Sequence, residues 1–231
     1  MSTNVGILVF SRHDSRRLPG KALRLLGGIP LLERVITRAQ ICGLPVYLAT
    51  TELPSDDALV AVADALGVEV FRGSSERVLE RAVLAAEVFG LDAFVRLCGD
   101  RPLFPLDDMQ DAVAAMRGEH DAAHDEPPDL VTTFSPGATV RGLTTEVVRT
   151  ETLRDLLDRG PSRYEQEHVT PHFYEHPEKF RIVRLPATPI RLTCPSFALD
   201  TELDLHNLQR IFAGSNAIDL SPAEADRIYR T

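Results

Sequence analysis

The sequence has little cysteine, and the few cysteines form no pattern. Cys42, Cys98 and Cys194 are odd in number and include no Cys-x-x-Cys pair. A disulfide framework is therefore not predicted, and the reducing cytoplasm is the favoured compartment. We interpret these three side chains as small, buried hydrophobic groups.

The sequence also lacks a long apolar run. No stretch approaches the roughly 18 apolar residues that a membrane span needs, so no membrane partner is predicted. Near the amino terminus, Val5–Phe10 is apolar, but this run is short and has no basic leader before it. We therefore expect a buried strand here rather than a signal peptide.

Positive charge is in deficit, because 25 lysines and arginines face 34 aspartates and glutamates, for a net charge of -9. Such a chain is a poor general binder of nucleic acid, and no nucleic-acid partner is predicted. One segment departs from this balance and fits either an anion-binding loop or a solvated surface. It carries a single acid, Asp14, among five basic residues: Arg12, Arg16, Arg17, Lys21 and Arg24.

The first half of the sequence alternates strand and helix patterns. Four such units in about 115 residues predict an α/β fold with a mostly parallel sheet and helices on both faces. Ligands of such sheets bind beyond the carboxyl ends of the strands. The predicted strands are Val5–Phe10, Val46–Thr50, Val68–Phe71 and Ala93–Leu97, and the predicted helices start at Pro30, at Ser55, near Ser74 or Ser75, and at Leu106.

The second half is less regular, and the 231 residues fit one domain. The segment Gly118–Pro128 is acidic and is expected to be an exposed loop. We predict strands at Leu130–Phe134, Thr139–Val148, Phe180–Leu185 and Phe197–Leu199, and helices at Thr152–Leu157, Tyr164–Tyr174, Leu203–Phe212 and Pro222–Tyr229.

The basic loop after the first strand has the chemistry of a polyphosphate site. Arginine forks and a lysine point charge match phosphate oxygens, and Gly20 would let the backbone approach a ligand closely. The loop is neither a Walker motif nor a Gly-x-Gly-x-x-Gly turn. Its spacing alone fits triphosphate binding and a surface loop about equally well.

Two aspartates follow apolar strands. Asp100 comes after the fourth predicted strand, and Asp200 comes after Phe197–Leu199. Mg²⁺ prefers hard oxygen ligands and commonly takes one or two carboxylates plus phosphate oxygens. For an isolated aspartate at a strand end, a turn or helix-cap role would be the simpler interpretation. The metal-site interpretation requires both carboxylates to lie close to the basic loop, whereas the turn or helix-cap interpretation does not.

Five motifs, in order along most of the chain, resemble the cytidylyltransferases that make CMP-activated acidic sugars. These are the acylneuraminate and Kdo cytidylyltransferases, and the resemblance is strongest to the branch of the spore coat polysaccharide biosynthesis protein F. The motifs are Ser11-Arg12-x-x-Ser15-x-Arg17-Leu18-Pro19-Gly20-Lys21, Phe71-Arg72-Gly73-Ser74 with Val78-Leu79-x-Arg81, Gly99-Asp100-x-Pro102, Tyr164-Glu165-x-Glu167-His168-Val169-Thr170-Pro171 and Leu199-Asp200-Thr201-x-x-Asp204-Leu205.

The resemblance implies a three-layer α/β/α nucleotide-diphosphosugar-transferase fold, Rossmann-like, over residues 1–231. It also implies a homodimer, with residues 135–190 as a dimerisation and acceptor-binding excursion. The expected reaction transfers CMP from CTP to an acidic sugar, with Mg²⁺, in glycan precursor biosynthesis. The implied ligands are Ser11, Arg12, Ser15, Arg17, Gly20, Lys21, Arg72 and Ser74 for the nucleotide, Asp100 and Asp200 for the metal, and Glu146, Tyr164, Glu165 and His168 for the acceptor.

Arg12, Lys21 and Asp100 are the implied catalytic residues. The chain departs from its branch at Arg101, where cysteine is common, and an extra cation there would alter the acceptor pocket. Glu146 fits an exposed strand residue as well as an acceptor ligand. His168 recurs with two further histidines at intervals of four residues, but a proline interrupts the spacing, so a metal site there is disfavoured.

Several other functions stay open at this point. Another nucleoside triphosphate or a phosphonate acceptor would use the same chemistry. A glycosyltransferase of similar fold commonly carries an Asp-x-Asp motif, which this sequence lacks. A non-catalytic module would not be expected to retain Arg12, Lys21, Asp100 and Asp200 together. The enzyme prediction requires that Lys21 and Asp100 meet in one crevice.

Overall fold

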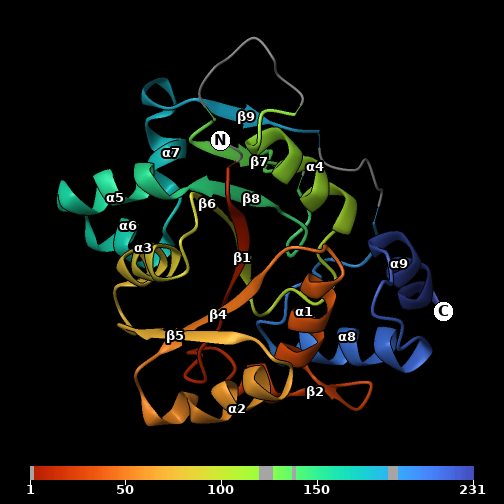
Figure 1. The fold of residues 1–231 in the computed structure, drawn as a ribbon. Helices are drawn as coiled ribbons and strands as arrows, with labels where there is room; N and C mark the ends of the chain where they lie inside the picture. The colour runs from red at the N-terminus through yellow and green to blue at the C-terminus, as the bar shows by residue number, and fades with distance from the viewer. Residues whose placement is uncertain (1–2, 120–126, 137–138, 187–191) are drawn as a thin grey trace.

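The strands predicted in the first half lie side by side in one seven-stranded sheet (Figure 1). This computed structural model describes residues 3–119, 127–136, 139–186 and 192–231. The order across the sheet is β5-β4-β1-β6-β8-β7-β9. The strands are β1 Val5–Phe10, β4 Val46–Thr51, β5 Glu69–Gly73, β6 Ala93–Cys98, β7 Leu130–Thr132, β8 Glu146–Arg149 and β9 Ile182–Arg184.

The strand order creates a crevice at the carboxyl ends of β1 and β6. From β1 the chain moves to β4 and then β5 on one side, and it returns to β6 on the other side of β1. These four strands are parallel, whereas β8 runs antiparallel to β6 and β7. The loops after β1 and β6 therefore diverge at a topological switch point, where ligands of such sheets bind.

Helices cover both faces of the sheet (Figure 1), which confirms the predicted α/β/α layering. Adjacent residues of a strand face opposite layers: Ile7 and Val9 belong to one core, and Leu8 belongs to the other. The first layer contains α1 Leu31–Gln40, α2 Asp57–Ala65, α4 Leu106–Met116, α8 Glu202–Gly214 and α9 Pro222–Arg230, and the second contains α3 Val78–Val88, α5 Thr150–Asp158, α6 Arg163–His168 and α7 Pro171–Glu175.

Three predicted elements differ from the structure. Of the predicted strand Thr139–Val148, only the part from Glu146 is extended, because a turn closes where the Leu143 N–H donates to Val140 O at 3.1 Å. The segment Phe197–Leu199 is no strand, since the Ser196 hydroxyl bonds both the N–H and the carbonyl of Ala198 and so replaces ladder bonds.

The predicted helix Tyr164–Tyr174 is two helices, α6 and α7. Val169 stands between them with φ 71°, the one positive φ of a non-glycine residue in the described ranges. The predicted caps also differ, because α2 and α3 follow Asp56 and Arg77, and neither helix has a side-chain cap. Ser74 nonetheless accepts a hydrogen bond from the Arg77 N–H at 3.1 Å.

A two-stranded hairpin, β2 Leu25–Leu26 with β3 Ile29–Pro30, joins the basic loop to α1. Within the described ranges, no helix has both the length and the apolar character that a bilayer crossing requires. Most of the predicted acidic loop, residues 120–126, lies outside the described residues.

Candidate active site

The basic loop meets Asp100, which follows β6, and Asp200, which precedes α8, at Lys21. Its ammonium nitrogen lies 2.7 Å from Asp100 Oδ2, 2.8 Å from Asp200 Oδ1 and 2.9 Å from the carbonyl oxygen of Leu199. Burial alone would lower the pKa of Lys21, but the two carboxylates outweigh burial and hold that pKa above its ordinary value. A charged lysine therefore joins segments nearly 180 residues apart.

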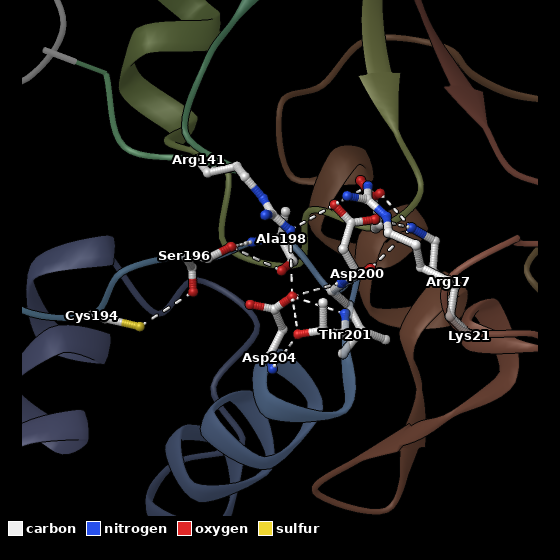
Figure 2. A network of polar contacts seen from close by, with 11 residues as sticks. Arg17, Lys21, Arg141, Cys194, Ser196, Ala198, Asp200, Thr201 and Asp204 are labelled. Carbon is white, nitrogen blue, oxygen red and sulfur yellow. Dashed lines mark hydrogen bonds and ion pairs between the residues drawn. The ribbon is translucent and has the colours of Figure 1, made fainter. Parts of the chain in front are cut away.

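Asp200 pairs with three cations from two segments, namely Arg17 and Lys21 of the basic loop and Arg141, as Figure 2 shows. Its Oδ2 lies 2.9 Å from a nitrogen of Arg17 and 2.6 Å from a nitrogen of Arg141. Burial would raise the pKa of Asp200, but Lys21, then Arg141 and Arg17, bring that pKa below its usual range. The sequence carried no signal for Arg141, because nothing local links residue 141 to residue 200.

The position of Asp200 is set by the start of α8. The Asp204 carboxylate accepts hydrogen bonds from the N–H of Thr201 at 2.9 Å and from the N–H of Asp200 at 3.1 Å (Figure 2). Thr201 and Asp204 form a capping box, in which each side chain accepts from the other's backbone N–H. The capping box therefore fixes the start of α8, and with it the backbone position of Asp200.

The basic loop is anchored by a buried carboxylate that sequence reasoning missed. Asp56 is fully buried, and it accepts hydrogen bonds from the His13 N–H at 2.7 Å and from the side chains of Thr50 and Thr51. Burial would raise the pKa of Asp56, but these hydrogen bonds hold it below its ordinary value. The loop then closes on itself, because Gly20, with φ 68°, donates its N–H to His13 O at 3.0 Å.

A cleft of about 360 Å³ opens over this cluster. It brings together most of the predicted nucleotide and metal ligands, namely Ser11, Arg12, Ser15, Arg17, Lys21, Asp100 and Asp200. The cleft is also lined by Arg16, Val78, Arg81, Cys98 and Glu167, which were not predicted as site residues. Of these, Val78, Arg81 and Glu167 lie within the family motifs, which was the signal available in the sequence.

Three predicted nucleotide ligands do not line the cleft, namely Gly20, Arg72 and Ser74. Gly20 shapes the loop as described above. The Arg72 guanidinium instead donates to the carbonyl of Thr51 at 2.9 Å and pairs with Asp57 at 2.7 Å. It therefore ties β5 to the end of β4 and to the first residue of α2.

A second cavity of about 380 Å³ adjoins the cleft, and His168 lines both. Glu146 and Tyr164 also line the second cavity, so three predicted acceptor ligands come together. The interpretation of Glu146 as an exposed strand residue is wrong, because its side chain is buried, 2.9 Å from Arg96 and 2.7 Å from the Tyr174 hydroxyl. Burial would raise the pKa of Glu146, but Arg96 and Tyr174 lower it.

The fourth predicted acceptor ligand, Glu165, serves the helix instead. Its carboxylate accepts the Ser162 N–H at 2.7 Å in a capping box, and its other oxygen lies 2.6 Å from His172 Nδ1. His172 packs its ring edge-on against His176 and Phe180. No group of three or more metal-ligating side chains gathers among the residues that the structure describes.

Arg101, which departs from the family pattern, lines the second cavity. Its guanidinium donates to the carbonyl of Thr144 at 3.0 Å. Within the described part of the chain it forms no ion pair, whereas the neighbouring Arg96 is paired with Glu146. The second cavity therefore contains one guanidinium that forms no ion pair among the described residues, although its charge acts on Glu146.

Comparison with known proteins places these motifs in a family. The family model described as "Cytidylyltransferase" matches residues 6–217. The chain is 32% identical over 215 residues to the spore coat polysaccharide biosynthesis protein SpsF of Bacillus subtilis (strain 168), covering 89% of this chain and 85% of that protein. Both chains are matched over nearly their whole length, so the similarity is not confined to the basic loop.

Solved structures agree with this match. A cytidylyltransferase from Leptospira borgpetersenii serovar Hardjo-bovis (strain JB197) superposes with a TM-score of 0.89 at 26% identity, covering 99% of this chain and 94% of that one. A CMP:2-keto-3-deoxy-manno-octonic acid synthetase solved with CTP gives a TM-score of 0.66 at 20% identity, covering 92% and 99% of the two chains. At that identity the second likeness establishes the shared fold.

Proposed function

This chain belongs to the cytidylyltransferase family, and we propose that it transfers CMP from CTP to an acidic sugar or related acceptor, releasing pyrophosphate in a Mg²⁺-dependent reaction of glycan precursor synthesis. The observation that carries the proposal is the convergence of Lys21 on Asp100 and Asp200 at the switch point of the sheet. It supplies cations for a polyphosphate and oxygen ligands for a metal in one cleft.

In the proposed reaction, an acceptor hydroxyl oxygen forms a bond to the α-phosphorus of CTP. The bond from that phosphorus to the bridging oxygen of the β-phosphate breaks, and pyrophosphate leaves with its electron pair. The hydroxyl proton passes to solvent or to a nearby base. Catalysis of such a step rests on positioning and on charge stabilisation. Lys21 and Arg12 are the cleft residues to which we assign stabilisation of the α-phosphate and the leaving group.

The donor set in the cleft fits Mg²⁺. One oxygen of Asp100 and one of Asp200 already face a single cation, the Lys21 ammonium, at 2.7 and 2.8 Å. Two hard, ionised oxygens directed at one point are what Mg²⁺ takes from a protein when a polyphosphate supplies further ligands. We assign Asp100 and Asp200 as the residues that would hold the metal. When bound, the metal would neutralise charge on the phosphate oxygens.

The second cavity is the proposed acceptor site. Two observations support this proposal. The cavity adjoins the cleft at His168, so an acceptor bound there would lie beside the nucleotide, and the Arg101 guanidinium, which forms no ion pair among the described residues, suits an anionic acceptor. Arg96 is less available, because Glu146 already pairs with it. We propose that the acceptor carboxylate pairs with Arg101, and that Tyr164 and His168 contact the rest of the acceptor.

Pyrophosphate release separates the alternatives directly. CTP, UTP, ATP and GTP would each be supplied with and without Mg²⁺, together with a panel of carboxylated sugars, the corresponding carboxamides and aminoalkyl phosphonates. The proposal expects release with CTP, Mg²⁺ and a carboxylated sugar. Release with another triphosphate would replace CTP in the proposal. Release with phosphonates alone would replace the acidic sugar. No release with any combination would contradict the enzyme assignment.

We also propose that the protein acts in the cytoplasm as a homodimer through residues 135–190. The described part of this excursion supports the idea, because α5, α6 and α7 gather at one end of the molecule beside the acceptor cavity (Figure 1). Analytical ultracentrifugation at micromolar protein would test it. A sedimentation coefficient of a 25.5 kDa monomer at all concentrations would contradict the dimer.

A further inference from the structure

Arg81 is a buried arginine of the cleft whose hydrogen bonds are incomplete among the described residues. It lies in the first turn of α3, lines the cleft, and is 3% exposed. One terminal nitrogen donates to the carbonyl of Ser74 at 2.6 Å. Its Nε is buried and has no hydrogen-bond partner within the residues that the structure describes. An unpaired donor of this kind costs free energy unless a ligand satisfies it.

Arg81 also lacks an ion-pair partner among the described residues. Across the described ranges, no carboxylate pairs with it, and the group beside it is another cation, Arg12, which donates to the carbonyl of the next loop residue, Ser75, at 3.0 Å. Burial, and then the positive charge of Arg12, lower the pKa of Arg81 to about 10, and the negative charge of Asp56 offsets only part of this lowering. Two guanidinium groups thus rest on successive carbonyls of one loop and repel each other.

Arg38 of α1 is a comparable buried arginine whose Nε does have a hydrogen-bond partner. Arg38 is 1% exposed, donates through Nε to the carbonyl of Phe104 and through a terminal nitrogen to the carbonyl of Ile218, and lies over the Phe104 ring. It does not line the cleft. Arg38 and Arg81 therefore share burial, charge and a pKa lowered to about 10, but among the described residues only Arg38 has a partner for its Nε.

The end of β5 is shaped around Arg81. A Cβ atom built on Gly73 would lie 3.1 Å from the Cγ and 3.5 Å from the Cβ of Arg81, and 3.0 Å from the Phe71 ring. Any larger residue at position 73 would press on the aliphatic stem of the arginine. The backbone thus leaves room for Arg81 to hold its guanidinium at the cleft, despite the cost of burying it there.

We propose that Arg81 and Arg12 form a second phosphate-binding position in the cleft, separate from Lys21, whose missing partners are oxygens of the bound polyphosphate. The inference rests on the proposed function, since it names residues of the same nucleotide site. In this arrangement Arg81 orients the nucleotide by binding the phosphates of the nucleotide. Lys21 instead contacts the carboxylates that we assign to the metal. Its free Nε and its remaining terminal N–H groups provide the planar fork that phosphate oxygens accept.

The test compares Arg81→Met with the matched control Arg38→Met, using thermal unfolding and calorimetric titration with inorganic pyrophosphate and with CTP. For Arg81→Met we expect an unchanged or higher melting temperature without ligand, because an uncompensated buried charge is removed. We also expect about 10- to 100-fold weaker binding of pyrophosphate and of CTP, the usual effect of losing a charge-assisted contact. Arg38→Met should show the reverse: a lower melting temperature and unchanged binding.

Each other outcome overturns the inference in a recognisable way. A lower ligand-free melting temperature with intact pyrophosphate binding, or an Arg81→Met protein that does not fold, would make Arg81 a structural residue like Arg38. Loss of CTP binding with intact pyrophosphate binding would assign Arg81 to the base or ribose. Retained affinity for both ligands would remove Arg81 from the site. If the unaltered protein binds neither ligand, the proposed function itself fails.

Discussion

The two ends of the cleft handle charge differently. At the Lys21 end, three cations face carboxylates: Lys21 pairs with Asp100 and Asp200, and Arg17 and Arg141 pair with Asp200. At the Arg81 end, Arg81 and Arg12 donate to backbone carbonyls and form no ion pair among the described residues. At the Lys21 end, which we call the balanced end, a metal ion could replace Lys21 beside the carboxylates. At the Arg81 end, which we call the unbalanced end, the two arginines need an anion to balance their charge. A metal-bound polyphosphate supplies both needs at once.

The largest effect should come from the balanced end. Replacing Asp100 by asparagine removes a carboxylate that we propose as a metal ligand and that pairs with Lys21, and we expect turnover to fall by about 1,000-fold or more. Pyrophosphate release would measure this loss, and circular dichroism would check that the fold persists. Asp107→Asn, on an exposed carboxylate of α4, is the matched control and should keep turnover within about twofold. Near-normal turnover of Asp100→Asn would exclude Asp100 from the site.

Lys21→Met should reduce turnover less than Asp100→Asn does. It should also show the difference between the two ends most clearly. We expect about 100-fold slower pyrophosphate release. Without ligand, Asp100 would lose its ion-pair partner and Asp200 would keep only Arg17 and Arg141. The free energy of unfolding should therefore drop by about 1–2 kcal/mol after allowance for partial exposure. Added Mg²⁺ should recover more stability in this variant than in the unaltered protein, measured by thermal unfolding. Equal stabilities of Lys21→Met and Arg81→Met would erase the contrast between the ends.

Acid should weaken the anchors of the site in a defined direction. The folded-state pKa values of Asp56, Asp200 and Glu146 all lie below those of the ordinary carboxyl groups. Their contribution to stability is therefore complete above about pH 5 and is lost as pH falls through the lowered values. Asp56→Asn should cost about 1–3 kcal/mol at pH 7, because an amide replaces a fully bonded carboxylate.

Chemical unfolding between pH 3 and pH 7 would measure this dependence. Since the Asp56→Asn variant has no carboxylate at this position, its stability should fall less steeply below pH 4 than that of the unaltered protein. Parallel stability profiles of the two proteins would show that Asp56 is not the acid-sensitive anchor of the basic loop.

The smallest effect is expected in the proposed acceptor cavity, which adjoins the cleft. Arg101→Gln removes the guanidinium charge but can keep a donor for the Thr144 carbonyl. We expect the KM for a carboxylated acceptor to rise about 10-fold while the KM for CTP is unchanged. Steady-state kinetics with each substrate varied in turn would measure both. A rise in the KM for CTP alone would place Arg101 with the nucleotide instead.

The predictable part of the fold was local in sequence. Buried strands such as Val5–Phe10 and the helix Leu106–Met116 have the predicted bounds, because burial and helix periodicity are properties of neighbouring residues. The failures were also local, at places where a side chain overrides propensity, as Ser196 does by bonding Ala198. The resemblance to a family supplied the cleft residues that pattern alone left undecided.

By itself, the sequence determined the α/β/α layering, the presence of a basic loop, and a carboxylate, Asp100, at the end of a strand. Only the tertiary structure decided which groups meet: Arg141 on Asp200, Asp56 under the loop, Arg72 on the carbonyl of Thr51, and Arg81 without an ion pair among the described residues. The reason is physical. Periodicity reports which residues are buried, but ion pairing depends on which chain segments the sheet order brings within a few ångströms of each other.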